Sequence, residues 1–112
     1  MPTFELLYWD GCPSVDEALA DLMAAFAELG QSATEVTLTE ILTDEQAADR
    51  GFIGSPTLRI DDHDLLPTPP GEPTGLTCRI YRRRDGRYSP TPDPDDLRDA
   101  LRAALCRSAG DA

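Results

Sequence analysis

The stretch AADRGFIGSPTLRI, residues 47–60, holds the signals that decide the fold. It begins within a short helix predicted over residues 43–50, which Thr43 would cap with Gln46 three positions on, the spacing of a capping box. Gly51 is expected to end this helix, because glycine readily adopts the left-handed conformation found there. After GFIGSP, the segment TLRI is expected to be a strand.

Working outward towards the N-terminus, the pattern predicts a strand, a helix and another strand. TFELLY, residues 3–8, is short and almost wholly apolar, as a strand covered on both faces would be. From Ser14 to Leu29 the apolar residues recur at helical spacing, and a glycine follows. ATEVTLTEI, residues 33–41, alternates as a strand does. This order predicts a parallel strand pair joined by a helical crossover.

Towards the C-terminus, a proline-rich loop leads to a further strand and a last helix. CRIYRR, residues 78–83, is interpreted as a strand whose apolar members are Cys78, Ile80 and, with the alternation broken, Tyr81, followed by the turn signal Asp85-Gly86. After Pro94, leucines four residues apart predict a helix. We therefore expect one α/β domain over residues 1–112, with a central mixed four-stranded sheet flanked by helices.

Composition excludes several classes of function. The net charge of −11 would repel nucleic acid and anionic membranes, so neither is expected as a partner. No apolar run is long enough to span a bilayer, and the first residues lack the basic start of a secretory signal. Three cysteines are too few for a disulfide scaffold. We therefore expect a cytoplasmic protein whose thiols, where they pair, do so transiently. The oligomeric state is not indicated.

Cys12 lies in WDGCPSV, between the first strand and the first helix. Pro13 is expected in the first helical turn, with Cys12 at or next to the N-cap, where unpaired N–H groups favour a thiolate. Asp10, Asp16 and Glu17 oppose that thiolate by charge repulsion. Cys12 is therefore either a reactive thiol of ordinary acidity or a small buried apolar residue.

The segment of residues 47–60 and the WDGCPSV segment together resemble the thioredoxin and glutaredoxin superfamily. Gly51-Phe52-Ile53-Gly54-Ser55-Pro56-Thr57 is similar, position by position, to the family's turn into a cis-proline and a strand, and CPSV takes the place of its Cys-x-x-Cys motif. The resemblance covers residues 3–61 and implies a thioredoxin-like three-layer fold. It implies that Cys12 is the nucleophile and that Pro56 is a cis-proline beside it. The other reading of Pro56 is an ordinary turn proline.

The resemblance also implies a binding site for a partner chain. Pro13, Ser14, Ser55, Pro56 and Thr57 would contact the protein or small-molecule thiol or disulfide that reacts with Cys12. A cis bond would expose the backbone N–H and carbonyl of Ser55, to which an extended chain could add as a strand. No cofactor is implied.

The motif departs from the family at Val15, which stands where a dithiol enzyme has its second cysteine. A mixed disulfide at Cys12 would then need Cys78 or an external thiol for its resolution. Monothiol glutaredoxins usually have Ser at this position. Cys78 is thus the candidate resolving thiol, or else a small apolar residue facing the core.

A narrower resemblance links the DGCP start, the GSPT middle and the GLTCRIY segment to short bacterial chains described as thioredoxin-like or as putative alkylmercury lyases. Two thiols suit a soft cation such as Hg(II). The alternative to a thiol-disulfide oxidoreductase is therefore a non-catalytic thioredoxin-fold binding module, or a protein that handles a soft metal such as mercury.

Three other features carry weaker hypotheses. Asp61, Asp62, His63 and Asp64 are either a solvated turn or ligands for a hard metal, and we assign no metal site. The arginines from Arg79 to Arg87 are either a charged strand edge or an anion site, and could pair with the acidic first half of the chain. Cys106 is expected to face outward.

Overall fold

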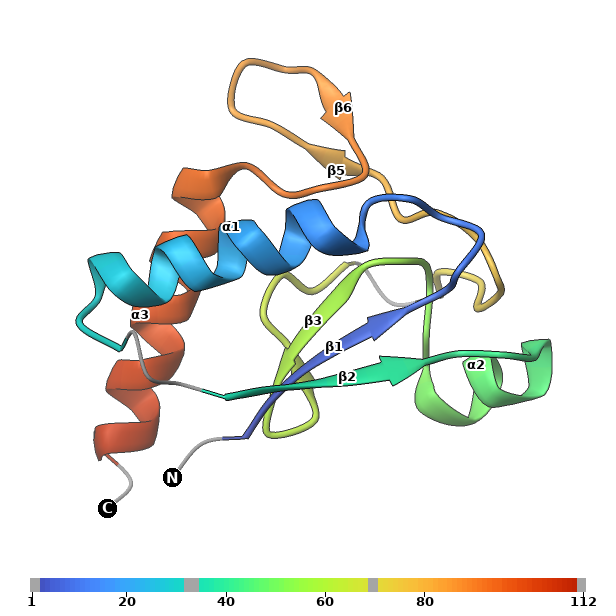
Figure 1. Ribbon diagram of the computed structural model, residues 1–112, viewed down its shortest axis with the longest axis horizontal. Coiled ribbons are helices and arrows are strands. Elements are labelled where there is room, and N and C mark those ends of the chain that lie inside the picture. Colours follow the sequence, from blue (N-terminus) through green and yellow to red (C-terminus); the bar gives the residue numbers. More distant parts are fainter. Residues whose placement is uncertain (1–2, 32–34, 69–70, 111–112) are drawn as a thin grey trace.

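The computed structural model describes residues 3–31, 35–68 and 71–110, with side chains only up to residue 107 in the last range. The elements in chain order are β1 (Phe4–Tyr8), α1 (Val15–Glu28), β2 (Val36–Glu40), α2 (Asp44–Arg50), β3 (Thr57–Ile60), β4 (His63–Asp64), β5 (Tyr81–Arg82), β6 (Tyr88–Ser89) and α3 (Pro94–Gly110) (Figure 1). The predicted strand over residues 33–41 is present as β2, and its residues 33 and 34 lie outside the described residues.

The central sheet has the strand order β2-β1-β3-β4. β1 is parallel to β2 and antiparallel to β3, and β4 is antiparallel to β3, so the sheet is mixed. This confirms the predicted α/β class, the four-stranded sheet and the parallel crossover through α1. The prediction was wrong about the fourth strand, which is the two-residue β4 and not the segment 78–83.

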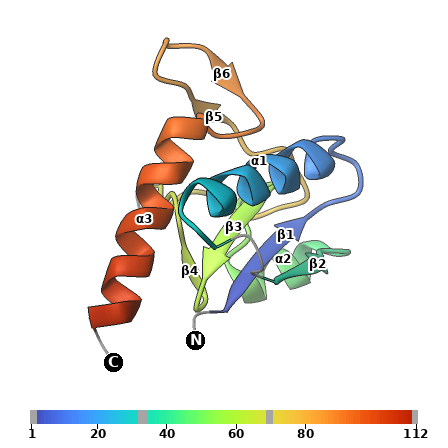
Figure 2. The ribbon, with the colours of Figure 1, turned by 60° about the vertical axis from the view of Figure 1, so that its left-hand side comes forward.

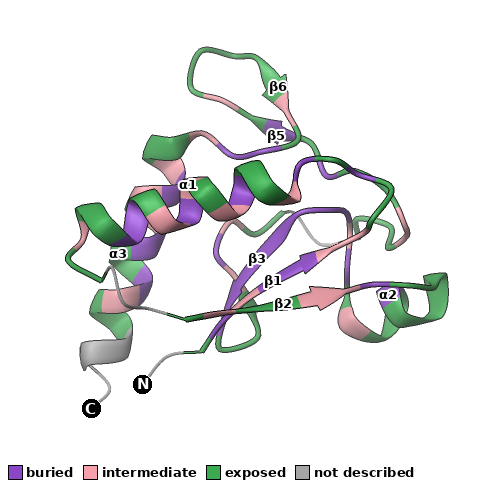
Figure 3. Ribbon diagram, in the orientation of Figure 1, coloured by how far each residue is buried: buried purple, intermediate pink, exposed green. Residues whose placement is uncertain are grey.

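The two faces of the sheet are covered by different helices. Phe4 and Leu6 of β1 pack with buried residues of α1 and α3, while Leu7 packs on the opposite face with Ile41, α2 and Phe52. Successive side chains of a strand point to opposite faces, which is why neighbours in β1 belong to different clusters. Figure 2 shows α1 and α3 together against the sheet, and Figure 3 shows β1 and β3 as its most buried strands.

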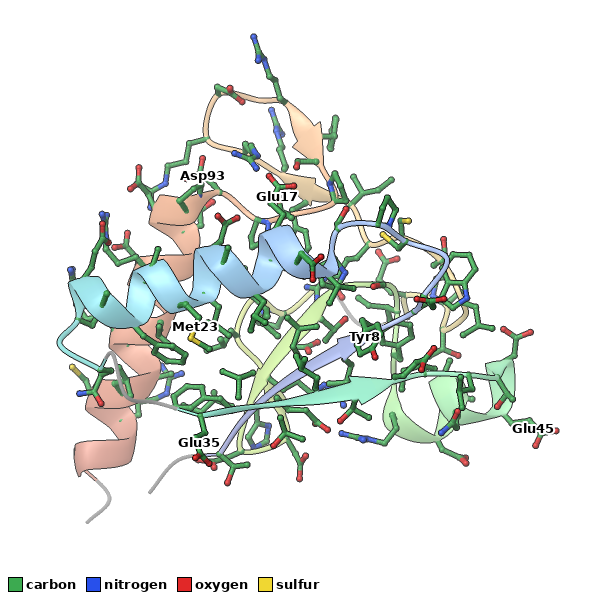
Figure 4. The ribbon with its side chains drawn as sticks, viewed as in Figure 1. Tyr8, Glu17, Met23, Glu35, Glu45 and Asp93 are labelled. Carbon is green, nitrogen blue, oxygen red and sulfur yellow. The ribbon has the colours of Figure 1, made fainter. Side chains whose placement is uncertain are left out.

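The helices bury the stripes that their spacing predicted. Leu22 and Phe26 of α1 are fully buried, and the Phe26 ring meets the Phe4 ring edge-on with centroids 4.8 Å apart. Leu97 and Leu101 of α3 complete this core. In Figure 4, Met23 lies on the sheet side of α1 and Glu45 extends outward from α2. None of the described helices has the length and apolar character needed to cross a membrane.

β5 and β6 form a separate hairpin that projects from the body (Figure 1). Its turn is at the predicted Asp85-Gly86, where Gly86 has a φ of 90° and its N–H donates to Arg83 O. The strand expected over residues 78–83 is reduced to Tyr81–Arg82, and Cys78 instead makes an isolated bridge with Ser55. The hairpin therefore connects the region around Ser55 to α3.

Candidate functional site

Cys12 lies in the turn that follows β1, at the carboxyl edge of the strand. Its N–H donates to Trp9 O at 3.0 Å, which closes the turn. The Trp9 ring folds back over Gly11, where a Cβ would lie 2.3 Å from a ring carbon, so a side chain at this position would displace the ring. The Cys12 side chain is 2% exposed, and its Sγ donates to Ser55 O at 3.5 Å. The turn after β1 thus directs the Cys12 thiol towards the carbonyl of Ser55, although the two residues are far apart in the sequence.

The helix after Cys12 begins later than the sequence predicted. α1 starts at Val15 with Ser14 as its N-cap, and the Ser14 hydroxyl makes no capping hydrogen bond. Pro13 therefore precedes the cap and is not in the first turn, because the tight turn at Trp9–Cys12 delays the helix. Cys12 is not the N-cap, and the field of a helix end falls off within about one turn. Val15 packs against the main core.

The predicted cis bond between Ser55 and Pro56 is present. Ser55, Pro56 and Thr57 are all buried, and the Thr57 hydroxyl donates to Gly54 O at 2.7 Å. Of the residues expected to contact a partner, Ser14 is also buried and Pro13 is exposed. These side chains are therefore mostly below the surface in this conformation.

The backbone of Ser55, expected to be open, is already paired. Its N–H donates to Thr77 O and its carbonyl accepts from the Arg79 N–H, both at 2.8 Å. Residues 75–79, which we call the strap, supply these groups and form the isolated parallel bridge between Ser55 and Cys78. The expectation of a free strand-pairing edge was wrong, because the chain itself fills that edge.

A partly buried leucine and a buried arginine hold the two ends of the strap. Leu76 packs, with Trp9, against the second core cluster that contains Phe52. Arg79 is 4% exposed, donates from Nη2 to Leu66 O, and lies with its guanidinium carbon 4.5 Å from the centroid of the Tyr81 ring. Such stacking of a cation on an aromatic face is favourable. The Tyr81 hydroxyl donates to Pro56 O at 2.6 Å, which ties this anchor to the cis-proline.

Cys78 lies between these anchors and is exposed, so its interpretation as a core residue was wrong. A hydrogen bond with the Cys12 side chain, burial, and the charge of Cys12 raise the pKa of the Cys78 thiol to about 11. The two thiols are therefore neighbours, one buried and one at the surface. All three cysteines are free thiols in the described structure, and Cys106 is exposed on α3 as predicted.

The remaining predicted clusters lie elsewhere. Asp61 and Asp62 form the left-handed turn between β3 and β4, and Asp64 pairs with Arg59 at 3.3 Å. Within the described residues, no group of three or more His, Cys, Asp or Glu side chains is placed to hold a metal. This cluster is therefore a turn that closes a hairpin of the sheet.

The arginine-rich stretch does not act as one patch. Arg84 pairs with Asp96 and Asp99 of α3 at 2.7 and 2.8 Å, whereas Arg79 is buried at the end of the strap. The described partners of Arg84 thus lie in the C-terminal helix, not in the acidic first half of the chain.

Sequence reasoning missed the roles of Trp9, Gly54, Leu76 and Tyr81. A Cβ on Gly54 would lie 2.7 Å from Arg79 N and 2.8 Å from Arg79 Cα, so glycine is needed for the strap to approach. A second glycine inside the GFIGSP turn was the available signal, since glycine there marks close backbone contact.

No family model, no curated protein and no solved structure matches this chain.

Proposed function

We propose that the protein is a thioredoxin-like thiol-disulfide exchange protein that uses Cys12 and Cys78 as one dithiol pair. The observation that carries the proposal is the convergence of both thiols on Ser55: Cys12 Sγ lies 3.5 Å from its carbonyl oxygen, and Cys78 is its bridge partner. The cis bond at Pro56 and the helices on both faces of the mixed sheet support a thioredoxin-like three-layer fold.

The pair allows a complete two-electron cycle. The Cys12 thiolate attacks a disulfide of a protein or small molecule, forms a mixed disulfide and releases one partner thiolate. The Cys78 thiolate then attacks the Cys12 sulfur, forms the Cys12–Cys78 disulfide and releases the second thiolate. Two protons leave the dithiol and the two released thiolates take up two protons, so the partner disulfide is reduced as the dithiol is oxidised. An external thiol reductant of the cytoplasm would restore the dithiol.

The order of attack follows from the proton on Cys78. Its pKa of about 11 keeps this thiol protonated at neutral pH, because the hydrogen bond with Cys12, burial and the charge of Cys12 all hold its proton, so Cys12 is assigned the first attack. Once Cys12 is in a mixed disulfide, that charge is gone and the Cys78 thiol ionises more readily. Cys78 thus takes the resolving role that Val15 leaves vacant.

The test is the formation of the disulfide in a Cys106→Ser background, which removes the third thiol. After equilibration with oxidised and reduced glutathione, mass spectrometry should find a Cys12–Cys78 disulfide, which is absent in Cys12→Ser and in Cys78→Ser. Reduction of insulin or of a small disulfide should be weak in the wild type and lost in Cys12→Ser. Equal rates in both proteins, or no Cys12–Cys78 disulfide in an oxidising buffer, would overturn the proposal.

The same pair of thiols favours one alternative, a binding module for a soft cation such as Hg(II). Two thiolates on neighbouring segments suit a soft metal, and binding would displace both protons. Titration with Hg(II) at a one-to-one ratio should then protect both thiols from alkylation in the Cys106→Ser protein. A protein that binds Hg(II) in this way but reduces no disulfide would favour the binding module.

A further inference from the structure

The strap makes the backbone contacts that a partner strand would make. The N–H and carbonyl of Ser55 pair with Thr77 O and the Arg79 N–H, and Phe52 O accepts from the Gly75 N–H at 3.1 Å. Recognition of an added strand uses main-chain hydrogen bonds for affinity and side-chain pockets for specificity. The strap, which bends at residues 75–77 and pairs with Ser55 at Cys78, thus lies along residues 52–55 and places Cys78 beside the thiol of Cys12.

The side chains of the strap have distinct surroundings: Leu76 is partly buried, Cys78 is exposed and Arg79 is buried. Leu76 is packed beside Trp9 on the second core cluster, two residues before Cys78. Arg79, one residue after Cys78, is 4% exposed and lies between Leu66 O and the Tyr81 ring. An apolar side chain, a cysteine and an arginine therefore take up three defined places around Ser55.

Within the site, the N-terminal end of the strap is the part that is held least firmly. Residues 71–74 before it are all exposed, as are Thr77 and Cys78 within it. The backbone–backbone hydrogen bonds of the strap all run to residues 52–55. Segments with few buried apolar contacts open at a lower free energy than the core of a sheet. Leu76 is the apolar side chain whose release would free this end.

We propose that the strap is an internal competitor for a partner segment, and that the site accepts an extended cysteine-containing peptide with an apolar residue two positions before the cysteine and an arginine directly after it. This inference rests on the proposed thiol exchange, since it names the partner that reaches Cys12. The net charge of −11 favours such a cationic segment over an acidic one. Opening of the strap then exposes Cys12 and the backbone of Ser55 together.

The first experiment measures alkylation of Cys12 by iodoacetamide in a Cys78→Ser/Cys106→Ser background. Adding Leu76→Ser removes the apolar anchor and should raise the alkylation rate of Cys12 by about tenfold or more, because the open state becomes more populated. Thr77→Ser is the matched control, since its side chain is exposed and its carbonyl still accepts from Ser55. Its rate should equal that of the background.

The second experiment uses synthetic peptides on the Leu76→Ser protein. GLTSRIY, with serine in place of the cysteine, cannot exchange thiols but should slow Cys12 alkylation and shift the fluorescence of Trp9, the single tryptophan. GLTSEIY and GSTSRIY, which lack the arginine or the leucine, should protect less. Equal protection by all three peptides, or by none, overturns the inference. A Cys12–Cys78 disulfide that forms in spite of such a result leaves the proposed function standing.

Two further measurements keep the test valid if Leu76→Ser fails to fold. Gly54→Ala places a methyl group against Arg79 N and Cα and should displace the strap without removing Leu76 from the chain. In the wild type, amide hydrogen exchange at Arg79 should be faster than at Leu6 and Leu58, which pair in the centre of the sheet. Exchange at Arg79 as slow as at these central residues would show that the strap does not open and would overturn the inference.

Discussion

At the residue scale, the acidity of Cys78 is set by Cys12. Replacing Cys12 by Ala in the Cys106→Ser background removes both the hydrogen bond and the charge that raise the pKa of Cys78 to about 11. The pKa of Cys78 should then fall towards the ordinary thiol value of about 8.5. Titration of thiolate ultraviolet absorbance measures it. A pKa that stays near 11 in Cys12→Ala would show that burial alone holds the proton.

The same shift predicts how stability depends on alkaline pH. The pKa of Cys78 is higher in the folded than in the unfolded protein, so the folded state holds the proton more tightly. This contribution is fully present below the ordinary thiol pKa and is lost as pH rises towards about 11. Urea unfolding of the Cys106→Ser protein between pH 8 and pH 11, run at about unit steps, should show a fall in stability. Additional Cys78→Ser should make that fall smaller.

Tyr81 links the hairpin to the cis-proline through one buried hydrogen bond. Its hydroxyl donates to Pro56 O at 2.6 Å, and burial raises its pKa above the ordinary range. Tyr81→Phe keeps the ring under Arg79 but leaves the carbonyl unpaired, at a cost of about 1–3 kcal/mol of unfolding free energy. Urea unfolding measures this loss. A stability within about 0.5 kcal/mol of the wild type would contradict the prediction.

At the element scale, strong periodicity and turn residues were sufficient to predict the helices and their ends. Weak alternation was not sufficient to predict which side chains of a strand are buried. The capping pair was predictable because the Thr43 hydroxyl accepts from the Gln46 N–H, and the left-handed Gly51 ends α2 as expected. In residues 78–83 the buried side chains are Arg79 and Tyr81, the opposite parity to the predicted Cys78 and Ile80. An arginine buried against an aromatic ring reverses the hydrophobic pattern, so the alternation of apolar residues does not indicate which side chains of this segment are buried.

In the candidate site, too, some features could be predicted from the sequence and others could not. Cys12 and Pro56 were predictable because each lies in a short motif next to a strong strand. The pairing of Ser55 with the strap was not, because it joins segments more than twenty residues apart through backbone groups, which every residue possesses. The motif led us to expect unpaired backbone groups at Ser55. In the structure, the strap of the same chain pairs with these groups.

The carboxylate of Glu5 links β1, on which it lies, to β2 and α2 through hydrogen bonds with one side chain of each. Burial raises the pKa of Glu5, but hydrogen bonds from Thr39 and Arg50 and the charge of Arg50 outweigh it, so the net pKa is lowered. This contribution to stability is present above the ordinary Glu pKa of about 4.3 and is lost as pH falls through the folded value. Arg50→Gln should therefore shift acid unfolding, followed by circular dichroism, to higher pH. Arg107→Gln, on the exposed end of α3, is the control and should leave it unchanged.

At the scale of the whole molecule, charge is distributed unevenly along the chain. Residues 1–49 contain acids but no Lys or Arg, whereas all ten basic residues follow. On α1, burial and, after it, the charge of Glu17 raise the pKa of Asp21, so Glu17 is one acidic neighbour that repels this carboxylate. The ion pairs of Arg84 with α3 are exposed, and exposed pairs contribute little. Net repulsion is therefore expected to exceed the gain from pairing at low salt.

Salt should therefore stabilise the protein. Raising NaCl from about 0.01 M to about 1 M shortens the screening length from about 30 Å to about 3 Å, which weakens repulsion spread over the surface more than contact pairs. The midpoint of thermal unfolding should rise, and chloride is preferred to sulfate because sulfate also strengthens apolar burial. Asp21→Asn, which removes one repelling carboxylate, should raise the midpoint at low salt and reduce its dependence on salt. A midpoint that falls on adding NaCl would instead show that the pairs between the hairpin and α3 dominate the electrostatics of the fold.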